Sequence, residues 1–152
     1  MFYEIITNKV WIIPVCSWAI AQLLKVLIIL IRDKQLDLRY LAVSGGMPSS
    51  HSAIVSALAT VLAIVEGGGS VVFGISVIFA LVVMYDAAGV RQSVGQQSIV
   101  LNRILRDLRT HRPMTEWGRD LREFMGHTSY QVIAGSLLGI AVAWSWLTIT
   151  GY

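Results

Sequence analysis

Residues 51–85 read HSAIVSALATVLAIVEGGGSVVFGISVIFALVVMY. Two apolar runs, 51–65 and 70–85, are separated by a glutamate and three glycines, and glycine gives a turn its conformational freedom. Hydrocarbon offers no partner to an unpaired backbone N–H or C=O, so apolar runs in a membrane must be helical. We therefore expect a helical hairpin whose tip reaches the far interface of a bilayer.

The whole chain has the composition of a membrane protein. Of its 152 residues, 55% are hydrophobic and 14% charged, whereas soluble domains average about 25% charged residues. A spanning helix needs about 20 largely apolar residues, and two further runs, 10–31 and 129–150, meet that length. The sequence predicts an all-α integral membrane protein, a single membrane domain over 1–152 with four transmembrane helices at 10–31, 51–65, 70–85 and 129–150.

Basic residues indicate the orientation of these spans. Three lie in the loop 32–50 and seven in 86–127, which together hold ten of the twelve in the chain. With four spans both loops face one side, and the positive-inside bias makes that side cytoplasmic. We expect cytoplasmic loops at 32–50 and 86–128 and both termini outside. Acidic residues are interleaved with the basic ones, so we expect lipid headgroups, and no nucleic acid, as partners.

The longer loop has its own helical pattern. Its apolar residues share one helical face and its polar residues another, which is typical of an amphipathic helix on a membrane surface. The apolar set is Val90, Val94, Leu101, Leu105 and Leu108, and the polar set is Arg91, Asn102, Arg106 and Arg109. After Pro113, apolar residues recur at Trp117, Leu121 and Met125. The pattern predicts one or two cytoplasmic interfacial helices.

Lys25 is a charged residue inside the first span. Burying a charge in a membrane costs free energy, so a charged residue in this position indicates a function. Arg32 follows seven residues later, two helical turns and about 10 Å of rise, so both cations share one face. They either extend to lipid phosphates or form part of a site for a phosphate group.

The segment Ser44-Gly45-Gly46-Met47-Pro48-Ser49-Ser50-His51-Ser52 opens the second span. Its glycines allow backbone N–H groups to converge, and Ser49 or Ser50 can cap the helix. The partial positive charge of a helix N-terminus favours an anion, for which phosphate is the natural guest. His51 then lies beside that anion, where an imidazole can act as a general acid. An ordinary capped helix start with an interfacial histidine is the alternative.

His127 opens the last span, within Gly126-His127-Thr128, and faces the same interface as His51. Asp86 and Arg91 end the third span on that side as well. They form either a structural ion pair or an orienting carboxylate with a further phosphate ligand. Close metal-ligand spacing such as His-x-x-x-His does not occur, so we expect no metal and no other cofactor.

In order along the chain, these segments resemble the three motifs of the type 2 phosphatidic acid phosphatase (PAP2) superfamily. The three segments that match are Lys25-x6-Arg32, Pro48-Ser49-Ser50-His51 and the run from Gly126-His127-Thr128 through Gln131-Val132 to Gly135. More closely, the chain is similar to the small divergent PAP2 branch, through 44–53 and 84–102. The resemblance covers about residues 18–139 and implies a PAP2-like helical bundle.

The resemblance also implies roles for these residues. His127 would be the nucleophile that forms a phosphohistidine, and His51 would protonate the leaving oxygen. Lys25, Arg32 and Ser50, with nearby backbone N–H groups, would bind the phosphate. Beside these, our own candidates for phosphate ligands are Ser49, Arg91 and Arg122. The implied function is a metal-independent phosphatase of a lipid phosphate or pyrophosphate, with its site facing the cytoplasm.

Some positions depart from the superfamily pattern. Gln131 stands where the superfamily has the carboxylate that orients the nucleophilic histidine, and Leu121 stands where it has an arginine, one residue before Arg122. A neutral amide accepts a hydrogen bond from His127 but cannot stabilise an imidazolium. Turnover is therefore expected to suffer unless another carboxylate, such as Asp86, takes the place of the missing one. The alternative is therefore a non-catalytic relative that binds phosphate headgroups or is a subunit of a membrane complex. The short chain also leaves room for a homodimer.

Overall fold

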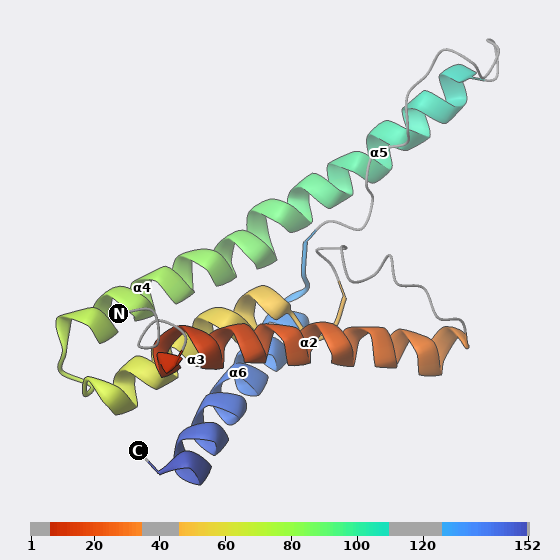
Figure 1. The fold of residues 1–152 in the computed structure, drawn as a ribbon. Helices are drawn as coiled ribbons and strands as arrows, with labels where there is room; N and C mark the ends of the chain where they lie inside the picture. The colour runs from red at the N-terminus through yellow and green to blue at the C-terminus, as the bar shows by residue number, and fades with distance from the viewer. Residues whose placement is uncertain (1–6, 35–45, 110–125, 152) are drawn as a thin grey trace.

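The computed structural model describes residues 7–34, 46–109 and 126–151, and all the regular elements within these ranges are helical. In chain order they are α2 (Lys9–Asp33), α3 (Ser50–Val65), α4 (Val71–Tyr85), the π-helical turn η2 (Asp86–Val90), α5 (Arg91–Arg109) and α6 (Ser129–Thr150). The helices α2, α3, α4 and α6 form a bundle, and α5 extends beyond it (Figure 1). The predicted helical membrane protein is confirmed at this level.

Short polar side chains set the beginnings of the apolar helices. Asn8, Ser49 and Ser70 each accept a hydrogen bond from a backbone N–H in the first turn of α2, α3 and α4. Such a bond satisfies one of the donors that a helix start leaves without a partner. The helix bounds therefore fall within two residues of the predicted spans.

Three of the described stretches are long and apolar enough to cross a membrane, Lys9–Arg32, Val71–Asn102 and Ser129–Thr150, and Ser50–Val65 is a shorter apolar helix. At 1.5 Å per residue α3 is about 24 Å long, less than the roughly 30 Å of bilayer hydrocarbon. The count of four full spans stays a prediction.

α4 ends at Tyr85, where the sequence predicted the end of the third span, but the chain does not enter a loop there. The chain stays helical through η2, so that α4, η2 and α5 follow one another in nearly one line (Figure 1). The helix predicted over residues 90–108 is α5, and its placement along a membrane surface stays a prediction. The second interfacial helix falls outside the described residues.

The core of the bundle lies where α2, α3 and α6 meet. Five buried apolar side chains form it: Ile13, Ala57, Val61, Ala143 and Leu147. Lys9 Nζ donates to Thr150 Oγ1 at 3.5 Å, so the two ends of the described chain lie together, at the hairpin end of the bundle (Figure 1). The opposite end holds the starts of α3 and α6. Which end faces the cytoplasm stays a prediction from charge.

Candidate functional site

The two histidines singled out in the sequence meet at one end of the bundle. His51 lies in the first turn of α3 and His127 two residues before α6. Their ring centroids are 5.8 Å apart and their planes are inclined by 62°. Two imidazoles at this distance can act on one small group held between or beside them.

Two glycines of α6 bring the histidines together. A Cβ on Gly135 would collide with the carbonyl oxygen of Ser49, and a Cβ on Gly139 with that of Ala53. The backbones of α3 and α6 therefore touch, and the order of these contacts shows that the two helices run in the same direction. Ser49 N–H also donates to the carbonyl of Gln131 at 3.0 Å. Both helix N-termini, with their partial positive charges, thus lie at the histidine end.

The π-helical turn η2 fixes the backbone of His127. Arg91 N–H donates to the carbonyl of Asp86, five residues back, rather than to that of Ala87, four residues back. The Ala87 carbonyl instead accepts from His127 N–H at 2.9 Å. Gly126, with φ of +92°, lies so close to α5 that a Cβ there would collide with the backbone nitrogen of Gln92. The end of α4 and the start of α5 therefore hold His127 in place.

Hydrogen bonds also fix the tautomer of the His127 ring. Gln131 Oε1 accepts from Thr128 N–H at 3.1 Å, which identifies the amide atom facing the turn as oxygen. The same oxygen lies 3.3 Å from His127 Nδ1, so Nδ1 carries the proton and donates it. Nε2 is then left with the lone pair. That nitrogen is buried and has no hydrogen-bond partner among the described residues.

Burial keeps the His127 ring neutral. The residue is 1% exposed, and the pKa of His127 is lowered from 6.5 to about 4, chiefly by desolvation. The neighbouring charges of His51 and Lys25 contribute to this lowering, while Gln131 and the Gly46 backbone act in the opposite direction. Near neutral pH, His127 therefore presents an uncharged nitrogen with a lone pair, as a nucleophile requires.

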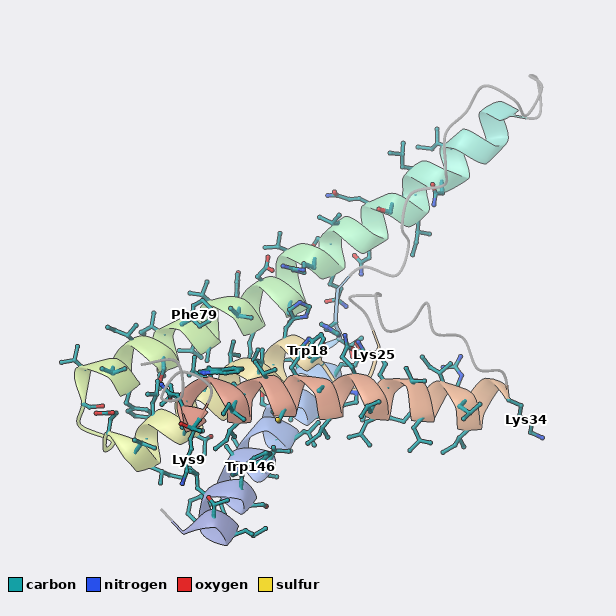
Figure 2. All side chains as sticks on the ribbon, viewed as in Figure 1. Lys9, Trp18, Lys25, Lys34, Phe79 and Trp146 are labelled. Carbon is teal, nitrogen blue, oxygen red and sulfur yellow. The ribbon has the colours of Figure 1, made fainter. Side chains whose placement is uncertain are left out.

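Lys25 is buried beside this pair. It is 1% exposed, and its aliphatic stem lies against Gly46, where an added Cβ would be 3.2 Å from Lys25 Cδ. Its ammonium group acts electrostatically on both histidines. Figure 2 shows Lys25 near the start of α3, well before Lys34, the residue that follows α2. Arg32, two turns farther along α2, is exposed.

The predicted ion pair between Asp86 and Arg91 is present. Arg91 Nε lies 2.6 Å from Asp86 Oδ2, and the two side chains are 44% and 39% exposed. Both groups act electrostatically on His51, so the pair lies at the edge of the site. The acceptor at His127 Nδ1 is Gln131.

The two predicted serines have different surroundings. Ser49 is buried and its Oγ accepts from Ser52 N–H at 3.3 Å and from the Ser52 hydroxyl at 3.0 Å, which makes it the cap of α3. Ser50, 2% exposed, is the first residue of that helix. By helix geometry, the first backbone N–H groups of α3 have no acceptor within the helix. Arg122 lies outside the described residues.

Two buried polar groups, one on η2 and one on α2, were not singled out in the sequence reasoning. The Ala87 carbonyl could not be predicted from the sequence, because every residue has a backbone carbonyl. Gln22 is 8% exposed and precedes Lys25 by three residues on α2, and its signal was a polar residue inside an apolar span. The described residues contain no group of three His, Cys, Asp or Glu side chains placed to hold a metal ion.

Comparisons with known proteins agree with the resemblance seen in the sequence. The model of the Divergent PAP2 family matches residues 6–142. The "Uncharacterized membrane protein YuiD" of Bacillus subtilis (strain 168) is 36% identical over 146 residues, which cover 90% of this chain and 92% of that protein. No solved structure matches the chain significantly.

Proposed function

This chain belongs to the divergent PAP2 family of membrane proteins, and from that premise we propose that it is a phosphatase of a lipid phosphate or pyrophosphate. The site would act at the cytoplasmic leaflet through a phosphohistidine, without a metal. The observation that carries the proposal is the hydrogen bonding of His127. Its Nδ1 donates to Gln131 Oε1 at 3.3 Å, and its Nε2 is neutral, buried and without a partner among the described residues.

In the first step, His127 Nε2 attacks the phosphorus atom. The bond from phosphorus to the leaving oxygen breaks, and protonated His51 gives its proton to that oxygen. His51 suits this role because its ring lies 5.8 Å from the His127 ring. The product is a phosphohistidine whose Nδ1–H still donates to the Gln131 oxygen.

In the second step, a water molecule attacks the phosphorus atom of the phosphohistidine and gives a proton to His51, now the base. The phosphorus–nitrogen bond breaks, inorganic phosphate leaves, and His127 returns to its neutral form. The overall reaction consumes one water and leaves both histidines as they began.

Positive groups around the histidines would stabilise the charge on the phosphoryl oxygens. Lys25 supplies an ammonium group that acts on both rings, and the start of α3 supplies backbone N–H groups at Ser50 and His51. Preorganised donors of this kind contribute most where charge develops during a reaction. Arg91 supplies a further cation at the edge, held by Asp86.

A second function, binding of phosphate headgroups without turnover, is favoured by Gln131. Its oxygen is already shared between Thr128 N–H and His127 Nδ1, and it carries no charge to stabilise an imidazolium. The cradle of cations and helix N-termini would bind a phosphate group equally well without catalysis.

The test is phosphate release from a panel of lipid phosphates in detergent, with metal ions chelated. The native chain is compared with His127→Ala and His51→Ala, and with His111→Ala as a control, because the proposal gives the third histidine no role. Release that stops in the first two variants and persists in the control is the expected result. No release from any lipid, even from Gln131→Glu, would contradict the phosphatase and favour headgroup binding.

A further inference from the structure

An apolar groove runs between α3, α4 and α6 and ends near the histidine pair. Its volume is about 420 Å³, within the range of about 300–1,000 Å³ that is usual for ligand pockets. Its walls include Ser56 and Thr60 of α3, Phe73, Ala80 and Met84 of α4, and Trp144 of α6. The Thr60 hydroxyl does not point a free donor into the groove, because it donates to the carbonyl of Ser56 at 2.8 Å. The groove therefore suits hydrocarbon.

The length of the groove matches the depth of one leaflet. From Phe73 to Met84, α4 rises by about 16 Å at 1.5 Å per residue. The hydrocarbon core of a bilayer is about 30 Å thick, so one leaflet contributes about 15 Å. A tail that enters at the Met84 end could therefore follow the groove over a length comparable to that of one leaflet.

Along α3 and α4, the Ser56 and Met84 ends of the groove lie within a few residues of the candidate site. Met84 Sδ accepts from the Ser136 hydroxyl at 3.0 Å, which closes the groove against α6. Three residues farther along, the Ala87 carbonyl accepts the His127 N–H. On the opposite wall, Ser56 follows His51 by five residues, about 7.5 Å along α3. A lipid with its tail in this groove therefore has its phosphate within reach of both histidines.

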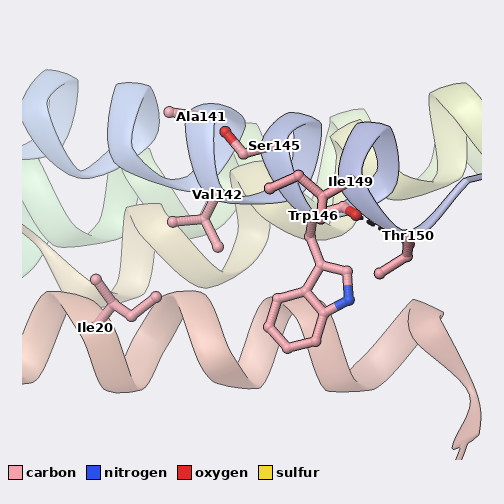
Figure 3. A pocket seen from close by; sticks show the side chains of 7 residues that line it. All are labelled: Ile20, Ala141, Val142, Ser145, Trp146, Ile149 and Thr150. Carbon is pink, nitrogen blue, oxygen red and sulfur yellow. Dashed lines mark hydrogen bonds between the residues drawn. The ribbon is translucent and has the colours of Figure 1, made fainter.

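A second apolar groove provides a contrast. It lies between α2 and the later part of α6, where Figure 3 shows Ile20 facing Val142 and Trp146. It runs toward Thr150, at the end of the bundle away from the histidines.

We infer that the groove between α3, α4 and α6 is the binding site for the hydrocarbon tail of the phosphorylated lipid, so that the substrates are lipids with a long tail. The inference rests on the proposed phosphatase function. The second groove, of about 440 Å³, is of similar size and apolar character, but none of its lining residues lies on α3 or α4, the helices that lead to His51 and to the Ala87 carbonyl. It holds ordinary bilayer lipid at most.

Two matched variants test the inference. Ala59→Phe places a ring in the groove beside Thr60, and Ala141→Phe places the same ring in the second groove. Rates are measured on two lipid phosphates that share a headgroup and carry tails of about six or about sixteen carbons. Ala59→Phe is expected to lower kcat/KM for the long tail about 10- to 50-fold, mainly through KM, since each displaced methylene loses its burial. The short-tail rate and the Ala141→Phe rates are expected to stay within about twofold of native.

A binding measurement separates failure of the inference from failure of the function. A long-tail lipid phosphate with a diazirine in mid-tail is crosslinked to His127→Ala, which cannot turn it over, and the labelled peptides are identified. Label confined to residues 56–64 and 73–84 is expected. Equal labelling of residues 141–150, or an Ala59→Phe effect equal for both tail lengths, would overturn the groove assignment while the phosphatase stands. Absence of turnover of either lipid by the native chain would overturn the phosphatase itself.

Discussion

Replacing Gln131 by glutamate is expected to speed catalysis, because it supplies a charge where the structure has a neutral acceptor. Gln131 Oε1 lies 3.3 Å from His127 Nδ1, and glutamate has nearly the same size, so a carboxylate oxygen can take that place. As His127 bonds to phosphorus, its ring becomes positive, and a carboxylate stabilises that charge more than an amide does.

The size of the effect follows from the hydrogen bond. A neutral hydrogen bond contributes about 0.5–1.5 kcal/mol and one to a charged group about 1.5–3 kcal/mol. The difference, about 1–1.5 kcal/mol, corresponds to a rise of about 5- to 12-fold in kcat. The matched variant Gln131→Met keeps the length but removes the acceptor, so kcat is expected to fall by about 2- to 12-fold from the loss of the neutral bond.

The assay is the pH dependence of phosphate release from a lipid phosphate, with all three proteins in the same detergent. A carboxylate beside His127 raises the pKa of that ring above the value of about 4 in the native protein, because an opposite charge favours the protonated form. Protonated His127 cannot attack, so the acidic limb of kcat/KM moves toward neutral pH in Gln131→Glu. Equal rates for the Glu and Met variants, with unmoved acidic limbs, would refute the orientation of His127 by Gln131.

Three further predictions follow from the same geometry. At Gly126 an added Cβ would be strained by the φ of +92° and would collide with the backbone of Gln92, so Gly126→Ala should lose at least about 1–3 kcal/mol of stability and most activity. Gly68 has nothing within 4 Å of an added Cβ, so Gly68→Ala should match the native protein in thermal unfolding. Because folding lowers the His127 pKa from 6.5 to about 4, protonation favours the unfolded state, and the free energy of unfolding should fall as the pH drops from 6.5 toward 4. In an acid titration of His127→Ala this loss of stability should be absent. Lys25→Met should lower kcat/KM by about 100-fold and weaken inhibition by inorganic phosphate, whereas Lys25→Arg should retain part of the activity and part of the inhibition. Equal losses in the Met and Arg variants would contradict a role for the positive charge.

The sequence predicts the spans well because polar caps bound the apolar runs. The run 129–150 is Ser129–Thr150 in the structure, and 51–65 is Ser50–Val65. Hydrophobic length and a capping residue are both local properties, so a sequence displays them directly. The continuation of α4 through η2 into α5 was not predicted, because the charged Asp86 after Tyr85 was taken as the start of a loop.

The site was predictable in its residues and not in its geometry. His51, His127 and Lys25 stand out because each is polar at the edge of, or within, an apolar run, and the structure brings them together. The parallel packing of α3 and α6 had only a weak signal in Gly135 and Gly139. The freed Ala87 carbonyl had none, since it depends on the π-helical turn.

Phosphohistidine trapping tests the central claim most directly. The native chain in detergent is mixed with a lipid phosphate carrying a radiolabelled phosphoryl group, and the reaction is quenched in base, which preserves phosphohistidine. The account predicts label on Nε2 of His127 within the turnover time, and none on His127→Ala. Turnover of the lipid without label at His127, or with label on His51 instead, would contradict it.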